Sequence, residues 1–98
     1  MTTATIDTIE IEDTIIGEIL LDGLDLADLG FERDQISGDT PLFDEVDGLG
    51  LDSLAALEVA VAVQQRFGFK IETLDRDFFE TNCSTVGALT RYIAGRLA

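Results

Sequence analysis

The sequence predicts an all-α fold, a bundle of four helices in which the third is short. Apolar residues recur at helical spacing in four segments, and no segment reads as a credible sheet. The length of 98 residues, of which 46% are hydrophobic, supports one small core. We therefore expect a single domain over residues 1–98, with residues 1–6 disordered.

The first helix is predicted over about residues 7–24. Its apolar stripe consists of Ile9, Ile16, Ile19 and Leu20. Gly17 lowers helix stability by up to about 1 kcal/mol relative to alanine, so tertiary packing must hold this helix. An alternative is that Ile9 and Ile11 begin as extended chain.

Residues 25–51 lose the helical period and are predicted to form a long loop. The breakers are Gly30, Gly38, Pro41, Gly48 and Gly50. Loops of this length within a compact domain tend to be functional. Leu42 and Phe43 are the best candidates to anchor the loop to the core, together with Phe31 and Ile36.

The second helix, about residues 53–67, is apolar on two sides. One face is assigned to the core: Ala56, Val59, Ala60, Val63 and Phe67. Leu54, Leu57 and Val61 lie nearly opposite and are expected to stay partly exposed, which is typical of a docking surface. The alternative is that Leu54 and Leu57 pack against the long loop.

The remaining segments complete the bundle. Gly68 is expected to end the second helix in the left-handed conformation, and residues 69–71 form a connector. A third helix of one or two turns, about residues 75–80, offers Phe78 and Phe79. The last helix spans about residues 85–97, with Ser84 or Thr85 as its N-cap.

The net charge of −14 limits the possible partners. Residues 1–58 hold 16 of the 20 acidic residues and one base, Arg33. Such a field repels nucleic acid and favours basic partners.

No apolar run reaches the roughly 20 residues of a membrane span, and the N-terminus lacks the features of a signal peptide. The expected location is the cytoplasm.

Several chemistries lack the residues they need. Cys83 is the only cysteine and there is no histidine, which excludes an internal disulfide, a thiolate-rich metal site and a Cys-His nucleophile. Cys83 is expected to be a buried small residue. Residues 44–47 lack the alternating oxygen ligands of an EF-hand calcium loop. We therefore expect no metal site.

Ser53 stands directly after an acid, Asp52, at the start of the second helix. Either side chain could cap the helix by accepting a backbone N–H bond. A hydrolytic role for Ser53 is disfavoured because the chain has no histidine to act as a base and no Gly-x-Ser-x-Gly elbow. No catalytic residue is expected.

Residues 42–71, LFDEVDGLGLDSLAALEVAVAVQQRFGFKI, resemble acyl carrier proteins of the phosphopantetheine-binding family, in which the modified serine lies in Asp-Ser-Leu. The resemblance extends to Ile-Ile-Gly-Glu-Ile-Leu in the first helix, Asp-Phe-Phe in the third and Thr-Val-Gly-Ala-Leu in the fourth. The segment GLGLDSL is most similar to discrete (type II) carriers of polyketide-type pathways, more than to those of housekeeping fatty acid synthesis.

The resemblance implies that Ser53 receives 4′-phosphopantetheine from coenzyme A through a separate phosphopantetheinyl transferase. The thiol at the end of this arm would hold acyl groups as thioesters for ketosynthases and other acyl-processing enzymes. Tethering raises the effective concentration of the cargo. By family analogy Asp52 would face the transferase, near its metal ion. The free carrier is expected to be a monomer without enzymatic activity.

One departure from the family affects docking. Fatty-acid carriers place acids just after the Asp-Ser-Leu motif and at the end of this helix, where this chain has Ala55 and residues 64–66, Gln-Gln-Arg. Along this helix, only Glu58 keeps an acidic charge. We therefore expect docking through Leu54, Leu57 and Val61, with the acidic loop steering the approach of partners.

The acyl chain of related carriers can be sheltered between the helices. The candidates for such a pocket here are Val59, Ala60, Val63, Ile71, Phe79, Val86 and Leu89. The alternative is that these residues form a closed core.

A function outside the resemblance is also possible. A non-enzymatic acidic adaptor, such as an inhibitor or a nucleic-acid mimic, would explain the charge but would give Ser53 no role.

Overall fold

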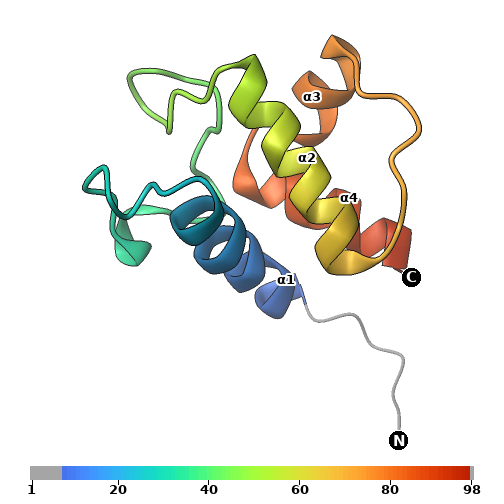
Figure 1. Ribbon diagram of the computed structural model, residues 1–98, viewed down its shortest axis with the longest axis horizontal. Helices are drawn as coiled ribbons and strands as arrows, with labels where there is room; N and C mark the ends of the chain where they lie inside the picture. The colour runs from blue at the N-terminus through green and yellow to red at the C-terminus, as the bar shows by residue number, and fades with distance from the viewer. Residues whose placement is uncertain (1–7, 98) are drawn as a thin grey trace, which may run out of the picture.

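The computed structural model describes residues 8–97, and the predicted disorder of residues 1–6 lies outside this range. The described elements are α1 Thr8–Thr14, η1 Ile15–Gly23, η2 Arg33–Gln35, α2 Ser53–Phe67, α3 Arg76–Asn82 and α4 Val86–Leu97. Residues 8–97 contain no strand, and one isolated bridge joins Pro41 to Thr85. The all-α prediction is confirmed, with a short third helix and a long loop between the first two (Figure 1).

The first helical segment is continuous but changes its winding. The α-helix α1 passes at Ile15 directly into η1, which is a π-helix. At its end the N–H of Leu24 donates to the carbonyl of Ile19, five residues back, at 3.1 Å. The alternative in which Ile9 and Ile11 begin as extended chain is wrong, because both lie in α1.

The core lies where α1 and η1 pack against α4 and where η1 packs against α2. Ile16, Ile19 and Leu20 are buried as predicted, together with Ile11 and Ile15. The placement of Ile9 in the buried stripe is wrong, since it is 71% exposed. It lies in the first turn of α1, two turns away from Ile16, so sharing a helical face with Ile16 does not bury it.

The long loop is anchored to the core by three buried side chains, Leu26, Ile36 and Leu42. Leu42 is buried as predicted, whereas Phe31 and Phe43 are only partly buried against the core. The loop backbone also pairs with the start of α4. The carbonyls of Gly38 and Thr40 accept bonds from the N–H groups of Gly87 and Val86 at 2.7 and 3.1 Å. The loop therefore satisfies N–H groups that a helix start leaves without partners.

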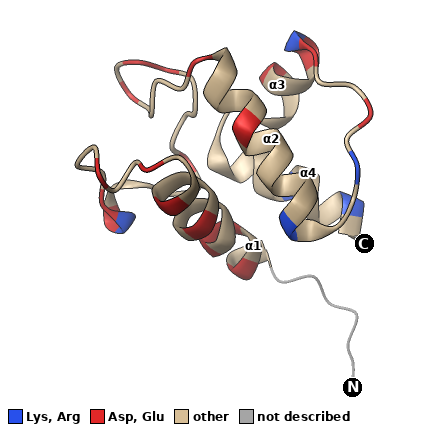
Figure 2. Cartoon of the chain, viewed as in Figure 1, with Lys and Arg blue, Asp and Glu red and all other residues tan. Residues whose placement is uncertain are grey.

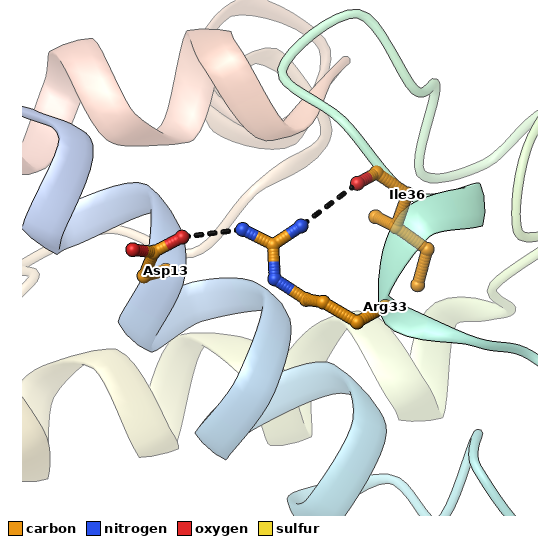
Figure 3. Close-up of polar contacts among 3 residues, drawn as sticks. All are labelled: Asp13, Arg33 and Ile36. Atoms are coloured by element: carbon orange, nitrogen blue, oxygen red, sulfur yellow. Dashed lines mark hydrogen bonds and ion pairs between the residues drawn. The ribbon is translucent and has the colours of Figure 1, made fainter.

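Arg33, in η2, fixes the middle of this loop to the first helix (Figure 3). Its guanidinium donates one bond to the carboxylate of Asp13 in α1 and another to the carbonyl of Ile36 at 3.2 Å. The single base of the acidic half of the chain thus has a structural role.

Helix α2 has the predicted bounds, and its termination by Gly68 in the left-handed conformation (φ 76°) is confirmed. The core face is confirmed for Ala56, Val59, Ala60 and Val63. Phe67 is only partly buried, at the last turn of the helix, where Arg66 covers its ring with 5.7 Å between Cζ and the ring centroid.

The last two helices are also capped by side chains. Asp75 accepts a bond from the N–H of Phe78 at 2.9 Å, so it precedes α3 as its N-cap, and α3 extends two residues beyond the predicted end. Thr85, one of the two predicted candidates, caps α4 by accepting from the N–H of Ala88 at 3.0 Å. Edge-to-face ring contacts then join the loop, α3 and α4: Phe43 with Phe79, Phe79 with Phe78, and Phe78 with Tyr92.

Candidate functional site

Ser53 is the first residue of α2 and is exposed to solvent. The capping function belongs to its neighbour, because the Asp52 carboxylate accepts a bond from the N–H of Ala55 at 2.8 Å. Within residues 8–97 the Ser53 hydroxyl makes no hydrogen bond. The two residues that the sequence left as alternative caps therefore have different roles, and the Ser53 hydroxyl is available for chemistry.

A pocket of about 390 Å³ opens beside Ser53, between the start of α2, the start of α3 and the end of the long loop. Its apolar lining consists of Phe43, Leu51, Ala56, Leu57, Leu74 and Phe79. Four charged residues, Asp52, Asp75, Arg76 and Glu80, line it as well. A hollow of this size and lining suits the apolar part of a small ligand.

Asp44 organises the turn of the loop that leads to Ser53. Its carboxylate accepts bonds from the N–H groups of Asp47 at 2.9 Å and Val46 at 2.8 Å, which hold the pKa of Asp44 below its ordinary value. Its carbonyl accepts from Gly48 and Gly50, each at 3.1 Å. Gly50 adopts a left-handed conformation (φ 63°) that suits glycine. Residues 44–47 thus form a turn that supports the pocket wall.

The apolar strip of α2 predicted from the sequence is exposed. Leu54, Leu57 and Val61 are exposed by 66%, 42% and 46%. Leu57 and Val61 also line a groove of about 390 Å³ between α2 and η1, together with Glu58, Ile19 and Leu24. Two of the three strip residues therefore line this groove, and Leu57 also lines the pocket beside Ser53.

The acyl-pocket candidates from the sequence fall into two groups. Six are buried in one cluster: Val59, Ala60, Val63, Ile71, Val86 and Leu89. Phe79 is partly buried and is the only one of the seven that lines the pocket beside Ser53. Of the other apolar lining residues, Leu51 and Leu74 lie outside the helical periodicity, so the sequence pattern gave no signal for them.

The charges are distributed unevenly over the bundle (Figure 2). Acidic residues line α1, η1 and the long loop, while Glu58 is the only acid within α2. Basic residues occur at the end of α2, at the start of α3 and in α4. Approach to Ser53 from the side of the loop therefore crosses a negative field, which attracts basic surfaces.

Three further findings concern the described residues. Burial raises the pKa of the Cys83 thiol to about 12, so this thiol is poorly reactive at neutral pH. Residues 8–97 hold no group of three or more His, Cys, Asp or Glu side chains placed to bind a metal ion. No helix in this part of the chain is long and apolar enough to cross a membrane.

A helical bundle that presents an exposed serine at a helix start, above an apolar pocket, has the arrangement expected of a carrier protein. The family model described as the phosphopantetheine attachment site matches residues 24–93. No curated protein and no solved structure matches the chain. The chain belongs to the phosphopantetheine attachment site family. Its members carry covalent 4′-phosphopantetheine and act as carriers without catalytic activity, so this protein is a phosphopantetheine carrier and not an enzyme.

Proposed function

We propose that Ser53 is the attachment point and that the protein is a discrete acyl carrier. The observation that carries this proposal is the exposed Ser53 hydroxyl, which makes no hydrogen bond among residues 8–97 because Asp52 caps the helix. The 4′-phosphopantetheine group, once bound, supplies a thiol that holds acyl groups as thioesters. Of the side chains lining the pocket, Ser53 alone carries a hydroxyl.

Attachment is a phosphoryl transfer at the Ser53 oxygen. A phosphodiester bond forms between this oxygen and the pantetheine-bearing phosphorus of coenzyme A, and the pyrophosphate bond to the adenosine bisphosphate leaving group breaks. The hydroxyl proton passes to a base of a separate phosphopantetheinyl transferase. The residues around Ser53 fit the product, since the start of α2 favours negative charge and the adjacent pocket offers apolar lining.

Intact mass spectrometry tests this proposal. After incubation with coenzyme A, Mg²⁺ and a promiscuous phosphopantetheinyl transferase, the mass of the protein should rise by one phosphopantetheinyl group. A protein that folds but gains no mass would contradict the proposal and favour the acidic adaptor.

The cargo is proposed to lie first in the pocket beside Ser53. This pocket is open and apolar, whereas Val59, Val63, Val86 and Leu89 are at most 3% exposed. Sheltering an acyl chain among these four side chains requires the helices to part. Phe79 lies between the pocket and the core, because it lines the pocket and packs against the core cluster.

Amide NMR shifts locate the cargo. When the thiol form is compared with forms carrying acyl chains of increasing length, we expect shifts first at Leu51, Ala56, Leu74 and Phe79. Longer chains should then shift Val63 and Leu89 if the core parts. Arg33, which belongs neither to the pocket lining nor to the core cluster, provides the reference. Unchanged shifts around the pocket with every chain would contradict this placement.

Partner enzymes are proposed to dock on the groove between α2 and η1 and on Leu54. The groove is lined mainly by apolar residues, and Glu58 is its only acid. The acidic first helix and loop would attract basic surfaces from a distance, while Leu57 and Val61 would make the contact. The resemblance of the segment GLGLDSL to polyketide-type carriers favours a ketosynthase among these partners.

Three variants in one groove separate apolar contact from charge. Val61→Asp places a charge in the contact without altering the lining of the pocket beside Ser53, and Leu57→Asp alters both. Each should lower kcat/KM for the transferase, and for a ketosynthase that elongates the loaded protein, at least about tenfold, or 1.4 kcal/mol. Glu58→Lys should leave both values within about twofold at 0.15 M salt, where exposed charges are screened. A large effect of Glu58→Lys with none from Val61→Asp would contradict apolar docking.

A further inference from the structure

The pocket beside Ser53 has one basic side chain in its lining, that of Arg76 at the start of α3. We infer that Arg76 binds the phosphodiester formed when Ser53 is loaded, and thereby fixes the first part of the prosthetic arm against α3. This inference rests on the proposed attachment at Ser53. Arg76 would be a positioning residue that decides the direction in which the arm leaves the serine.

Arg76 is available for such a contact. Its side chain is 89% exposed, and its ion pair with Glu80 has 3.8 Å between Nε and Oε2, which is too long for a hydrogen bond. An exposed pair of this kind contributes little to stability. The Arg76 guanidinium can therefore change partner at low cost.

Three other arginines are already engaged. Arg33 bonds to Asp13, Arg66 pairs with Glu18 at 3.4 Å, and Arg96 donates to the carbonyl of Lys70 at 3.0 Å. Arg91 lines a different hollow, against α1 and the loop. Arg76 is thus the arginine that shares a pocket with Ser53.

The charge around Ser53 favours this pairing. Asp52, Asp75 and Glu80 line the same pocket as Arg76, and loading adds one more negative charge. Asp52 and Asp75 are bonded to N–H groups of their own helices and remain where they are. A guanidinium offers parallel N–H donors that match two phosphate oxygens. The phosphodiester can therefore accept hydrogen bonds from Arg76, whereas Glu80, at 3.8 Å, accepts none.

The position of Arg76 within α3 supports a role outside helix stability. A cation in the first turn of a helix opposes the helix dipole, and acids are preferred there. Asp75 and Asp77 supply that preference in α3, whereas Arg76 does not. With the phosphodiester held at Arg76, the rest of the arm would begin between α2 and α3, beside the apolar lining formed by Leu74 and Phe79.

The test uses full-length ¹⁵N-labelled protein before and after loading, with loading verified by intact mass. We expect the Arg76 Nε–Hε signal to shift on loading. The ³¹P resonance of the loaded protein should move in Arg76→Gln, move less in Arg76→Lys, and stay unchanged in Arg66→Gln, the matched control at the other end of α2. The Arg76 shift should shrink at 1 M salt, where the Debye length is about 3 Å.

The outcomes separate this inference from the proposed function. A folded protein that gains no mass overturns both. A mass gain at Ser53 with the same Arg76 signal in both forms, and the same ³¹P resonance in Arg76→Gln, overturns the role of Arg76 alone. An Arg76 shift that occurs only when the thiol carries a dicarboxylic acyl group also overturns it, because the guanidinium would then bind the carboxylate of the cargo.

Discussion

Replacing Ser53 with alanine is expected to abolish the mass gain from coenzyme A and transferase without weakening the fold. The loss should be complete, because no other residue lining the pocket carries a hydroxyl. The fold should persist because Asp52 caps α2 and the Ser53 hydroxyl makes no hydrogen bond within residues 8–97. A change within about 0.5 kcal/mol is typical of such surface substitutions. Intact mass and thermal unfolding, measured on the same preparation, check both statements.

Asp52 provides the matched pair for this experiment. Asparagine caps helices about as well as aspartate, while alanine costs about 1 kcal/mol at this position. Asp52→Asn should therefore keep the unfolding temperature and lower the rate of loading if the charge faces the transferase. Asp52→Ala should lower both the unfolding temperature and the rate of loading. Loading of Asp52→Asn at the unchanged rate would show that Asp52 acts only as a cap. Full loading of Ser53→Ala would refute the assignment of the attachment site.

Replacing Gly48 with alanine is expected to destabilise the protein and to distort the pocket. An added Cβ would lie 2.1 Å from the carbonyl oxygen of Pro41, which is backbone and cannot rotate away. That oxygen also accepts the N–H of Leu49 at 3.0 Å, and the N–H of Leu51 bonds to Leu42 at 2.9 Å. Relieving the clash must disturb the segment that carries Leu51 and Ser53. Overpacking of this kind costs about 1–3 kcal/mol.

Thermal unfolding measures this cost, since 1 kcal/mol corresponds to about 4–8 °C for a domain of this size. The matched control is Gly95→Ala in α4, where the added Cβ meets nothing within 4 Å apart from its chain neighbours and the backbone of its own helix. That variant should be unchanged or stabilised by up to about 1 kcal/mol, because alanine favours helix over glycine. Gly48→Ala should also load more slowly. Equal unfolding temperatures for wild type and Gly48→Ala would mean that the loop does not hold this close approach in solution.

The helices could be predicted from the sequence because each carries its own local signals. Apolar spacing marks α2 and α4, and Asp52, Asp75, Thr85 and Gly68 supply caps at their ends. The π-helical winding of η1 was missed, since α and π turns differ in which carbonyl each N–H selects, and the spacing of isoleucines does not encode that choice. The exposure of Ile9 was missed for a related reason: a helical face is local, but burial depends on where the neighbouring helices end.

The sequence by itself determined the helical class, the exposed strip on α2 and the position of Ser53, because all three follow from residue types at fixed spacing. Only the tertiary structure decided which of Asp52 and Ser53 caps the helix, since both have the required oxygen. It also decided the pocket beside Ser53, whose lining joins Phe43 of the long loop to Leu74 and Arg76 at the start of α3, two segments that are far apart in the chain. Such a site exists only after the long loop and α3 pack beside α2, and no local pattern records that packing.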